Sequence, residues 1–222
     1  MTPATPTLLK IDFVSDIVCP WCAIGLAALA QAAERLAGQV RLDWHFQPFE
    51  LNPGMGPQGE DLFEHLAAKY GSTLEQLRQM HAQIDARGAA LGFTFSERRT
   101  RIYNTFDAHR LLHWLEVEGT GEQRLALQRA LFTSYFTDGE NPGEHAVLLR
   151  LVARLGLDEA RARAVLQSQE YTDAVRQQQA FYQGQGIHSV PAVIINERHL
   201  IQGGQPVEVF EQALRQIAAQ QA

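Results

Sequence analysis

The chain has 222 residues, of which 45% are hydrophobic and 20% are charged, a composition typical of globular domains that excludes disordered, collagen-like and coiled-coil chains. Its 19 Lys and Arg against 25 Asp and Glu give a net charge of −6, and because the basic residues form no cluster we expect no nucleic-acid partner. The longest run of apolar residues, 17–30, is an uncharged stretch too short to cross a bilayer, so we expect no membrane association.

The first predicted elements form a β-α-β unit. Partial alternation of apolar residues predicts a strand over residues 8–14. From Cys22 to Leu36 apolar residues recur every three or four positions, which predicts an amphipathic helix that ends before Gly38. Alternation resumes over residues 40–49. A helix that connects two strands in this way implies that the strands are parallel.

The middle of the chain predicts helices and few strands. Apolar residues at helical spacing, interrupted by Gly and Pro, predict helices over residues 61–70, 74–91, 104–118, 122–136, 144–155 and 158–167. The last part returns to mixed structure, with a helix over residues 171–184, strands over 192–196 and 199–202, and a helix from residue 206 onward. The turn between these two strands is so short that they must be antiparallel.

The two cysteines of the chain form the sequence Cys19-Pro20-Trp21-Cys22 at the predicted junction of strand and helix. The amides of a helix's first turn have no intrahelical partner and the helix dipole is positive there, so we expect a thiolate at Cys19 to be stabilised. Pro20 suits the first turn because no N–H is needed there. One turn further on, Cys22 is expected to face the core. This arrangement favours a disulfide donor or isomerase over a strong reductant.

The cysteine pair also allows two non-catalytic roles. A structural zinc ion needs four ligands, and since the chain has no third cysteine, histidines would have to supply two of them. The pair could also be two inert cysteines in the core.

The compartment bears on this choice. Asp12 and Asp16 stand where a signal peptide would carry positive charge, so we expect no signal peptide and a cytoplasmic protein. In the cytosol thiols are kept reduced, and a Cys pair there is more often catalytic or metal-binding than structural.

Two features lie outside the cysteine motif. Ser189-Val190-Pro191 directly precedes the predicted strand at residues 192–196, and the sequence alone leaves open whether the proline is cis or trans. His109 lies with Phe106 and His113 on one helical face. His109 could line a cleft over Cys19, or it could be a core histidine bonded to a backbone carbonyl. A metal site at His109 and His113 is not expected, because the Glu of the H-E-x-x-H pattern is missing.

Three segments carry a family resemblance: SDIVCPWC at residues 15–22, NTFDAHRL at residues 104–111 and SVPA at residues 189–192. Together with the order of predicted elements, they resemble the DsbA family of thioredoxin-fold proteins, and within it the FrnE-like branch. The resemblance implies an α/β fold class, a thioredoxin-like fold with a large all-helical insertion. It places a thioredoxin-like domain at residues 8–50 and 170–222, and a helical insertion domain at residues 51–169.

The resemblance also implies a thiol-disulfide oxidoreductase or disulfide isomerase. Cys19 would attack or receive the substrate sulfur, and Cys22 would resolve the resulting mixed disulfide. The Val190–Pro191 peptide would be cis and would face the cysteine pair. The implied catalytic residues are Cys19, Cys22 and Pro191, and the implied substrate-binding residues are Pro20, Trp21, Ser189, Val190 and His109.

The expected substrates are proteins, peptides or small molecules that contain a disulfide or a thiol. We expect no bound cofactor and no metal, and glutathione is a candidate co-substrate. Two departures from the family limit the transfer of its mechanism. Phe13 stands six residues before the first cysteine, where many thioredoxin-fold enzymes carry a buried acid, and the chain lacks the additional C-terminal cysteine pair of some FrnE-like proteins.

Two alternatives differ in reaction class. The chain also resembles the hydroxychromene-carboxylate isomerases and kappa-class transferases, which use glutathione without oxidising it and commonly have Ser where this chain has Cys19. Retention of both cysteines argues against that alternative. The other alternative is a non-catalytic binding module that uses the thioredoxin-fold cleft.

Overall fold

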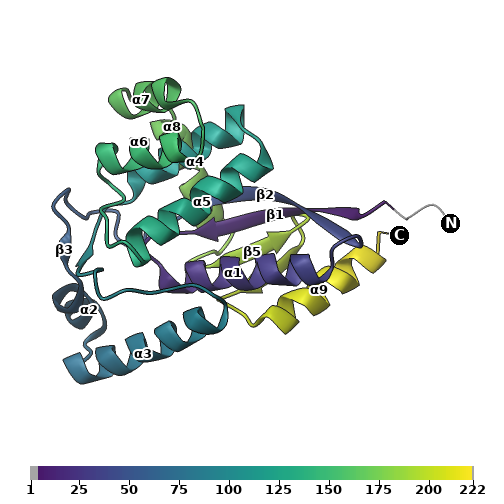
Figure 1. Cartoon of the computed structure of the whole chain (residues 1–222), viewed down its shortest axis with the longest axis horizontal. Coiled ribbons are helices and arrows are strands. Elements are labelled where there is room, and N and C mark those ends of the chain that lie inside the picture. Colours follow the sequence, from purple (N-terminus) through teal and green to yellow (C-terminus); the bar gives the residue numbers. More distant parts are fainter. Residues whose placement is uncertain (1–4, 222) are drawn as a thin grey trace.

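A four-stranded sheet forms the centre of the molecule in the computed structural model, which describes residues 5–221 (Figure 1). The strand order is β2-β1-β5-β6. The strands are β1 (Thr7–Ser15), β2 (Val40–Pro48), β5 (Ala192–Ile195) and β6 (His199–Gln202). β1 pairs with β2 in parallel, whereas the β1–β5 and β5–β6 pairs are antiparallel. The predicted parallel and antiparallel pairs are therefore both confirmed.

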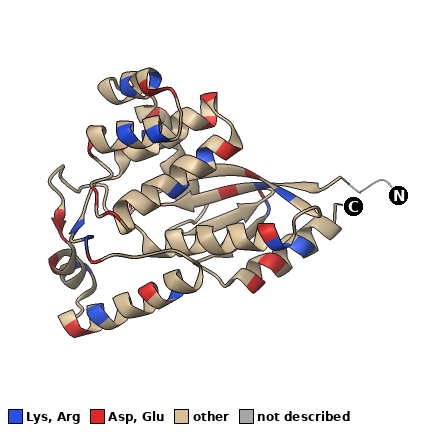
Figure 2. Cartoon of the chain, viewed as in Figure 1, with Lys and Arg blue, Asp and Glu red and all other residues tan. Residues whose placement is uncertain are grey.

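Two helices, α1 (Pro20–Arg35) and α9 (Val207–Ala219), pack against each other along this sheet (Figure 1). The uncharged stretch of the sequence forms most of α1, and the helix has no charged residue before Glu34 and Arg35 at its C-terminal end (Figure 2). Small side chains such as Ala28 are fully buried there. The stretch that is too short for a bilayer thus belongs to the core of the fold.

A layer of helices follows β2 in the chain. It comprises α2 (Leu62–Tyr70), α3 (Leu74–Ala90), α4 (Phe106–Glu118), α5 (Gly121–Phe136), α6 (His145–Arg154), α7 (Glu159–Gln167) and α8 (Thr172–Gly184). Each predicted helix is present, with ends that differ by one or two residues. Capping explains two of the starts, because Thr73 and Gln76, and Thr120 and Gln123, form reciprocal capping boxes.

One small sheet was not predicted. β3 (Glu60–Asp61) and β4 (Arg101–Ile102) pair as an antiparallel ladder of two residues each. A strand of two residues is too short to show alternation, so its sequence carries no strand signal.

The helical layer is joined to the sheet at β2, which contacts α4, α5 and α8. Arg124 of α5 is buried and donates from Nε to the carbonyl oxygen of Trp44 in β2 at 2.7 Å. Every strand of the four-stranded sheet lies within residues 8–50 and 170–222 apart from Thr7, and α2 to α7 lie within residues 51–169. The division into two domains itself stays a prediction.

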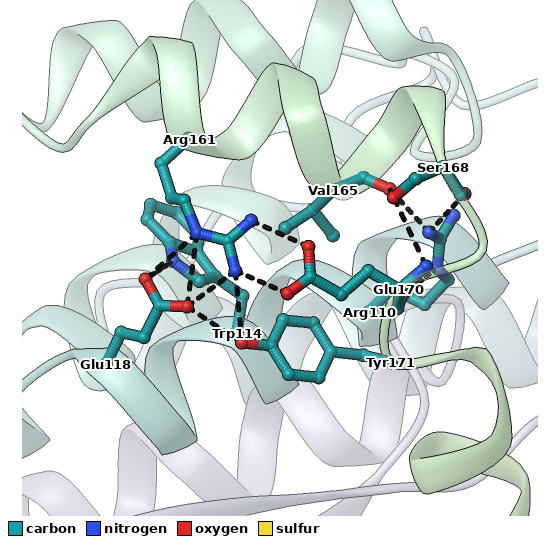
Figure 3. A network of polar contacts seen from close by, with 8 residues as sticks. All are labelled: Arg110, Trp114, Glu118, Arg161, Val165, Ser168, Glu170 and Tyr171. Atoms are coloured by element: carbon teal, nitrogen blue, oxygen red, sulfur yellow. Dashed lines mark hydrogen bonds and ion pairs between the residues drawn. The ribbon is translucent and has the colours of Figure 1, made fainter.

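A polar network joins α4, α7 and the segment between α7 and α8 (Figure 3). The guanidinium of Arg161 in α7 lies between the carboxylates of Glu118 and Glu170, at 2.6 Å and 2.5 Å. Arg110 of α4 donates to the backbone carbonyls of Val165 and Ser168, near the C-terminal end of α7. The network therefore holds α7 on α4.

In the described part of the chain, no helix combines the length and the apolar character that a membrane span requires.

Candidate active site

Cys19 is the N-cap residue of α1. Its backbone is extended, at φ −90° and ψ 112°, and its carbonyl oxygen accepts hydrogen bonds from the amides of Cys22 and Ala23 at 3.0 Å and 3.4 Å. Pro20 is the first helical residue, where no N–H is needed. The predicted placement at the positive end of the helix is therefore observed. The Sγ of Cys19, however, accepts no hydrogen bond from a first-turn amide.

The second cysteine lies deeper than the first. Cys19 is 4% exposed and Cys22 is 0% exposed, and both are free thiols. Burial, together with the contact with Cys19, raises the pKa of the Cys22 thiol well above its usual value. At neutral pH Cys22 is consequently a protonated thiol behind Cys19.

The segment before β5 lies against the cysteine motif. The Val190–Pro191 peptide is cis, as the family resemblance implied. The thiol of Cys19 donates to the carbonyl oxygen of Val190, with 3.6 Å between sulfur and oxygen. Pro191 packs on α1 at Gly25, where a β-carbon would lie 3.1 Å from Cγ of Pro191. Glycine at position 25 thus lets the helix approach the proline closely.

A cavity of about 590 Å³ opens beside Cys19, a volume within the range of small-molecule sites. Cys19, Pro20, Trp21, Ser189 and Val190 all lie on its wall. The structure therefore brings together most of the site residues that the resemblance implied. The rest of the cavity wall belongs to the helical layer and includes Leu66, Lys69, Tyr70, Met80, His81 and Arg99.

The sequence did not reveal these residues of α2, α3 and the segment before β4. The apolar spacing of an amphipathic helix shows which face is turned inward but not whether that face meets a core or a cavity. In Figure 1, α2 and α3 lie near the end of α1 at which Cys19 is found. Tyr70 of α2 shares this wall with Cys19, and the pKa of its hydroxyl is raised by partial desolvation and then by the charge of Cys19.

The expectation that His109 lines the cleft is corrected by its burial. The ring is 3% exposed, and Nε2 lies 3.0 Å from the carbonyl oxygen of Phe49 and 3.7 Å from Oδ1 of Asp16. A carbonyl only accepts, so Nε2 carries the proton. His109 is absent from the cavity wall and takes the other form that the sequence left open, a core histidine bonded to a backbone carbonyl.

Asp16 connects the cysteine motif to the helical layer. Its carboxylate is buried and accepts hydrogen bonds from the hydroxyl of Thr105 at 2.8 Å and from the amide of Leu51 at 2.7 Å. Phe13, at the position of the acid found in many thioredoxin-fold enzymes, is a core residue that packs edge-on against Phe46 at 5.9 Å. Asp16 is therefore the acidic group next to the cysteines, three residues before Cys19.

No three His, Cys, Asp or Glu side chains gather in a metal-binding arrangement within residues 5–221. His113, the partner of His109 in the metal site that we considered, contacts Gln178 Oε1 through Nδ1 at 3.2 Å instead. Burial lowers the pKa of its imidazole.

Comparisons with known proteins bear on the fold and the family of this chain. A 2-hydroxychromene-2-carboxylate isomerase has 15% identity and a TM-score of 0.74, and the match covers 96% of this chain and 97% of that one. The cytosolic disulfide reductase DsbM from Pseudomonas aeruginosa, solved with GSH, has 19% identity and a TM-score of 0.60, with 93% and 98% covered. These two matches indicate the shared fold alone.

Two closer matches identify the family. A probable DsbA oxidoreductase from Streptomyces coelicolor is 31% identical with a TM-score of 0.86, and the match covers 96% of this chain and 91% of that one. The family model of the DSBA-like thioredoxin domain matches residues 10–215. The FrnE-like branch stays a prediction. The chain belongs to the family of DSBA-like thioredoxin domains.

Proposed function

We propose that this protein is a thiol-disulfide oxidoreductase or disulfide isomerase that works through Cys19 and Cys22. The observation that carries the proposal is the unequal placement of the two sulfurs. Cys19 lies on the wall of the cavity, while Cys22 is fully buried and its thiol has a raised pKa. One sulfur can meet a substrate, and the other can meet only the first sulfur.

The exchange takes place in two steps. The thiolate of Cys19 attacks one sulfur of a substrate disulfide, so that a bond forms between them and the other substrate sulfur leaves as a thiolate. The thiolate of Cys22 then attacks Cys19, which closes the protein disulfide and releases the remaining substrate sulfur. The substrate gains two electrons that the protein dithiol loses. Run in reverse, the same steps oxidise a substrate dithiol.

Trapping the intermediate tests the proposal. In Cys22→Ser the second step is blocked, so the reduced variant should accumulate a mixed disulfide at Cys19 when it is treated with oxidised glutathione or with bis(2-hydroxyethyl) disulfide. Intact-mass spectrometry measures the adduct. Cys19→Ser is the matched control and should form none. Absence of any adduct on Cys22→Ser with either disulfide would contradict the mechanism. A redox titration of the wild-type pair against glutathione then gives the direction of electron flow.

Glutathione is our candidate co-substrate, and the cytoplasm is our proposed compartment. The cavity beside Cys19 supports glutathione as co-substrate, because its volume of about 590 Å³ lies within the range of small-molecule sites. The structural likeness to DsbM, a cytosolic disulfide reductase solved with GSH, supports both. Isothermal titration with reduced glutathione measures the binding, and cell fractionation locates the protein.

A glutathione-dependent isomerase or transferase is the second candidate. The likeness of fold to 2-hydroxychromene-2-carboxylate isomerase favours it. Such an enzyme activates glutathione without needing a resolving thiol. Isomerase or transferase turnover that survives Cys22→Ala, with glutathione binding intact, would favour this candidate over the oxidoreductase.

A non-catalytic binding module would instead still bind its partner after both thiols are removed.

A further inference from the structure

The wall of the cavity beside Cys19 is positively charged, although the chain as a whole carries −6. Lys69 and Arg99 lie on this wall, and no Asp or Glu of the described residues does. Lys69 is already engaged, since its ammonium donates to the carbonyl oxygen of Leu51 at 2.9 Å and to Oδ1 of Asn52 at 2.7 Å. Arg99 is the cation whose charge is still available to a ligand.

The charge of Arg99 is not neutralised within the protein. In residues 5–221, no carboxylate oxygen comes within 4.0 Å of its guanidinium. Arg161, by contrast, is paired with two carboxylates. Three acids, Asp61, Asp85 and Glu97, lie with Arg99 on the wall of a neighbouring cavity of about 510 Å³. The pKa of Asp85 is raised, because burial outweighs the lowering effect of the charge of Arg99.

Aromatic rings hold the guanidinium in place. Its central carbon lies 5.0 Å from the ring centre of Phe136 and 5.6 Å from that of Tyr135, and both rings are fully buried. Rings at these distances attract a cation but accept no conventional hydrogen bond from its N–H donors. Apart from the contact of Nη2 with His81, the hydrogen bonds of residues 5–221 leave the N–H donors of this guanidinium available to an acceptor.

The neighbour of Arg99 on the wall is a neutral acceptor. Nη2 of Arg99 lies 3.4 Å from Nε2 of His81. Burial, followed by the charge of Arg99, lowers the pKa of the His81 imidazole to about 4. At neutral pH His81 consequently accepts from Arg99 without competing for an anion. Another histidine of the wall, His65, does meet an acid, since its Nδ1 lies 2.6 Å from the exposed carboxylate of Glu60.

We propose that Arg99 binds a carboxylate of the substrate, and that the protein therefore prefers disulfides that carry a carboxylate near the reacting sulfur. The inference rests on the proposed thiol-disulfide exchange at Cys19. A guanidinium and a carboxylate form a pair of parallel hydrogen bonds, and such charge-assisted bonds are about twice as strong as neutral ones. Arg99 is thus a specificity-determining residue, not a participant in the exchange itself.

Three small disulfides of different charge test the proposal: 3,3′-dithiodipropionate is an anion, bis(2-hydroxyethyl) disulfide is neutral and cystamine is a cation. The rate constant of the reduced protein with each is divided by that of the neutral thiol dithiothreitol with the same disulfide, which corrects for the intrinsic reactivity of each disulfide. We expect the wild type to favour the anion over the neutral disulfide by about tenfold, as a charged hydrogen-bonded contact provides.

Three variants separate the effect of Arg99 from a general effect of positive charge on the protein surface. Arg99→Gln should lower the anion-to-neutral ratio by about tenfold and leave the neutral rate nearly unchanged. Arg99→Lys should keep part of the preference, because it keeps the charge but not the paired hydrogen bonds. Arg98→Gln is the matched control, since Arg98 is exposed and absent from the cavity wall, and its ratio should stay within about twofold of the wild type.

A wild-type ratio near one, an unchanged ratio in Arg99→Gln, or an equal fall for all three disulfides would overturn the proposal. The wild-type ratio decides even if a variant does not fold. If the neutral disulfide does not react at all, the proposed exchange itself fails, whereas reaction of all three without charge preference removes only the inference about Arg99.

Discussion

The Sγ of Cys19 lies 3.6 Å from the carbonyl oxygen of Val190, a residue 171 positions away in the chain. The outer thiol is therefore held by the backbone of the segment that precedes β5. Once Cys19 is bonded to a substrate sulfur it has no proton to donate, and the carbonyl of Val190 can then accept a hydrogen bond from a backbone amide of a bound peptide. The two segments that the resemblance paired are in direct contact.

The two cysteines should differ in reactivity towards iodoacetamide. Cys22 is 0% exposed and the pKa of its thiol is raised, so its thiolate is scarce at pH 7. We expect alkylation at Cys19 to be at least about tenfold faster than at Cys22. Tandem mass spectrometry of the peptide that contains both residues measures the two rates. Protein unfolded in urea is the control and should show similar rates, and equal rates in the folded protein would argue against the assignment.

The second step of the exchange should accelerate with pH. Below its pKa, the thiolate fraction of a thiol rises tenfold per pH unit. Because burial is the largest cause of the raised pKa of Cys22 and persists in the mixed disulfide, we expect the lifetime of that intermediate to shorten by up to about tenfold per unit between pH 7 and 9. Rapid acid quenching followed by mass spectrometry measures it. A lifetime that does not vary with pH would show that deprotonation of Cys22 is not limiting.

Asp16 should contribute to stability mainly through the two donors that it satisfies at less than 3 Å. Asp16→Ala leaves the partly buried amide of Leu51 and the buried hydroxyl of Thr105 without their acceptor, which we expect to lower the free energy of unfolding by about 2–4 kcal/mol. Thr105→Val removes one of the two bonds and should cost about 1 kcal/mol. Urea denaturation measures both. A loss in Thr105→Val as large as that in Asp16→Ala would place the effect elsewhere.

Gly204 should resist substitution because α1 passes close to it. A β-carbon there would lie 2.9 Å from the carbonyl oxygen of Trp21 and 3.4 Å from Cγ2 of Ile24. We expect Gly204→Ala to destabilise the protein by about 1–3 kcal/mol, as overpacking does. Gly184 in α8 is the control: nothing lies within 4 Å of its β-carbon position, so Gly184→Ala should stabilise the protein by about 0.4–1 kcal/mol. Thermal unfolding followed by circular dichroism compares the two variants with the wild type.

The Glu118 carboxylate should make stability depend on pH. Hydrogen bonds from Arg161, Tyr171 and Trp114 lower its pKa from 4.5 to about 2 (Figure 3). A pKa that is lower in the folded state means that the stabilisation is complete above about 4.5 and disappears as pH falls towards 2. Glu118→Gln should therefore destabilise the protein more at pH 7 than at pH 3 in urea denaturation.

A surface carboxylate provides the control for Glu118. Glu34→Gln changes an exposed acid near the end of α1 that lies within 4.0 Å of no Lys, Arg or His nitrogen in residues 5–221. A pH dependence of the same size in both variants would mean that the network around Arg161 is not its source.

The sequence predicted local structure better than contacts. Spacing identified α1 and its neighbours within one or two residues, because apolar periodicity is set along the chain itself. It also placed His109 on one helical face with Phe106 and His113, but periodicity does not show how deeply a side chain is buried. The ring bonds to the carbonyl oxygen of Phe49 and does not face the cavity. The contact of Cys19 with Val190 followed only from the family resemblance. The place of Arg99 on the cavity wall was not predicted, since it depends on how the helical layer folds back over the cysteine motif.

The depth of Cys19 limits the shape of what can reach it. With 4% of its surface accessible, and with walls contributed by the motif itself, the segment before β5 and the helical layer, the sulfur is recessed. We therefore expect a disulfide in the flat surface of a rigid folded protein to react poorly with Cys19. We expect the reacting bond to be presented by a protruding loop, an unfolded polypeptide or a small molecule.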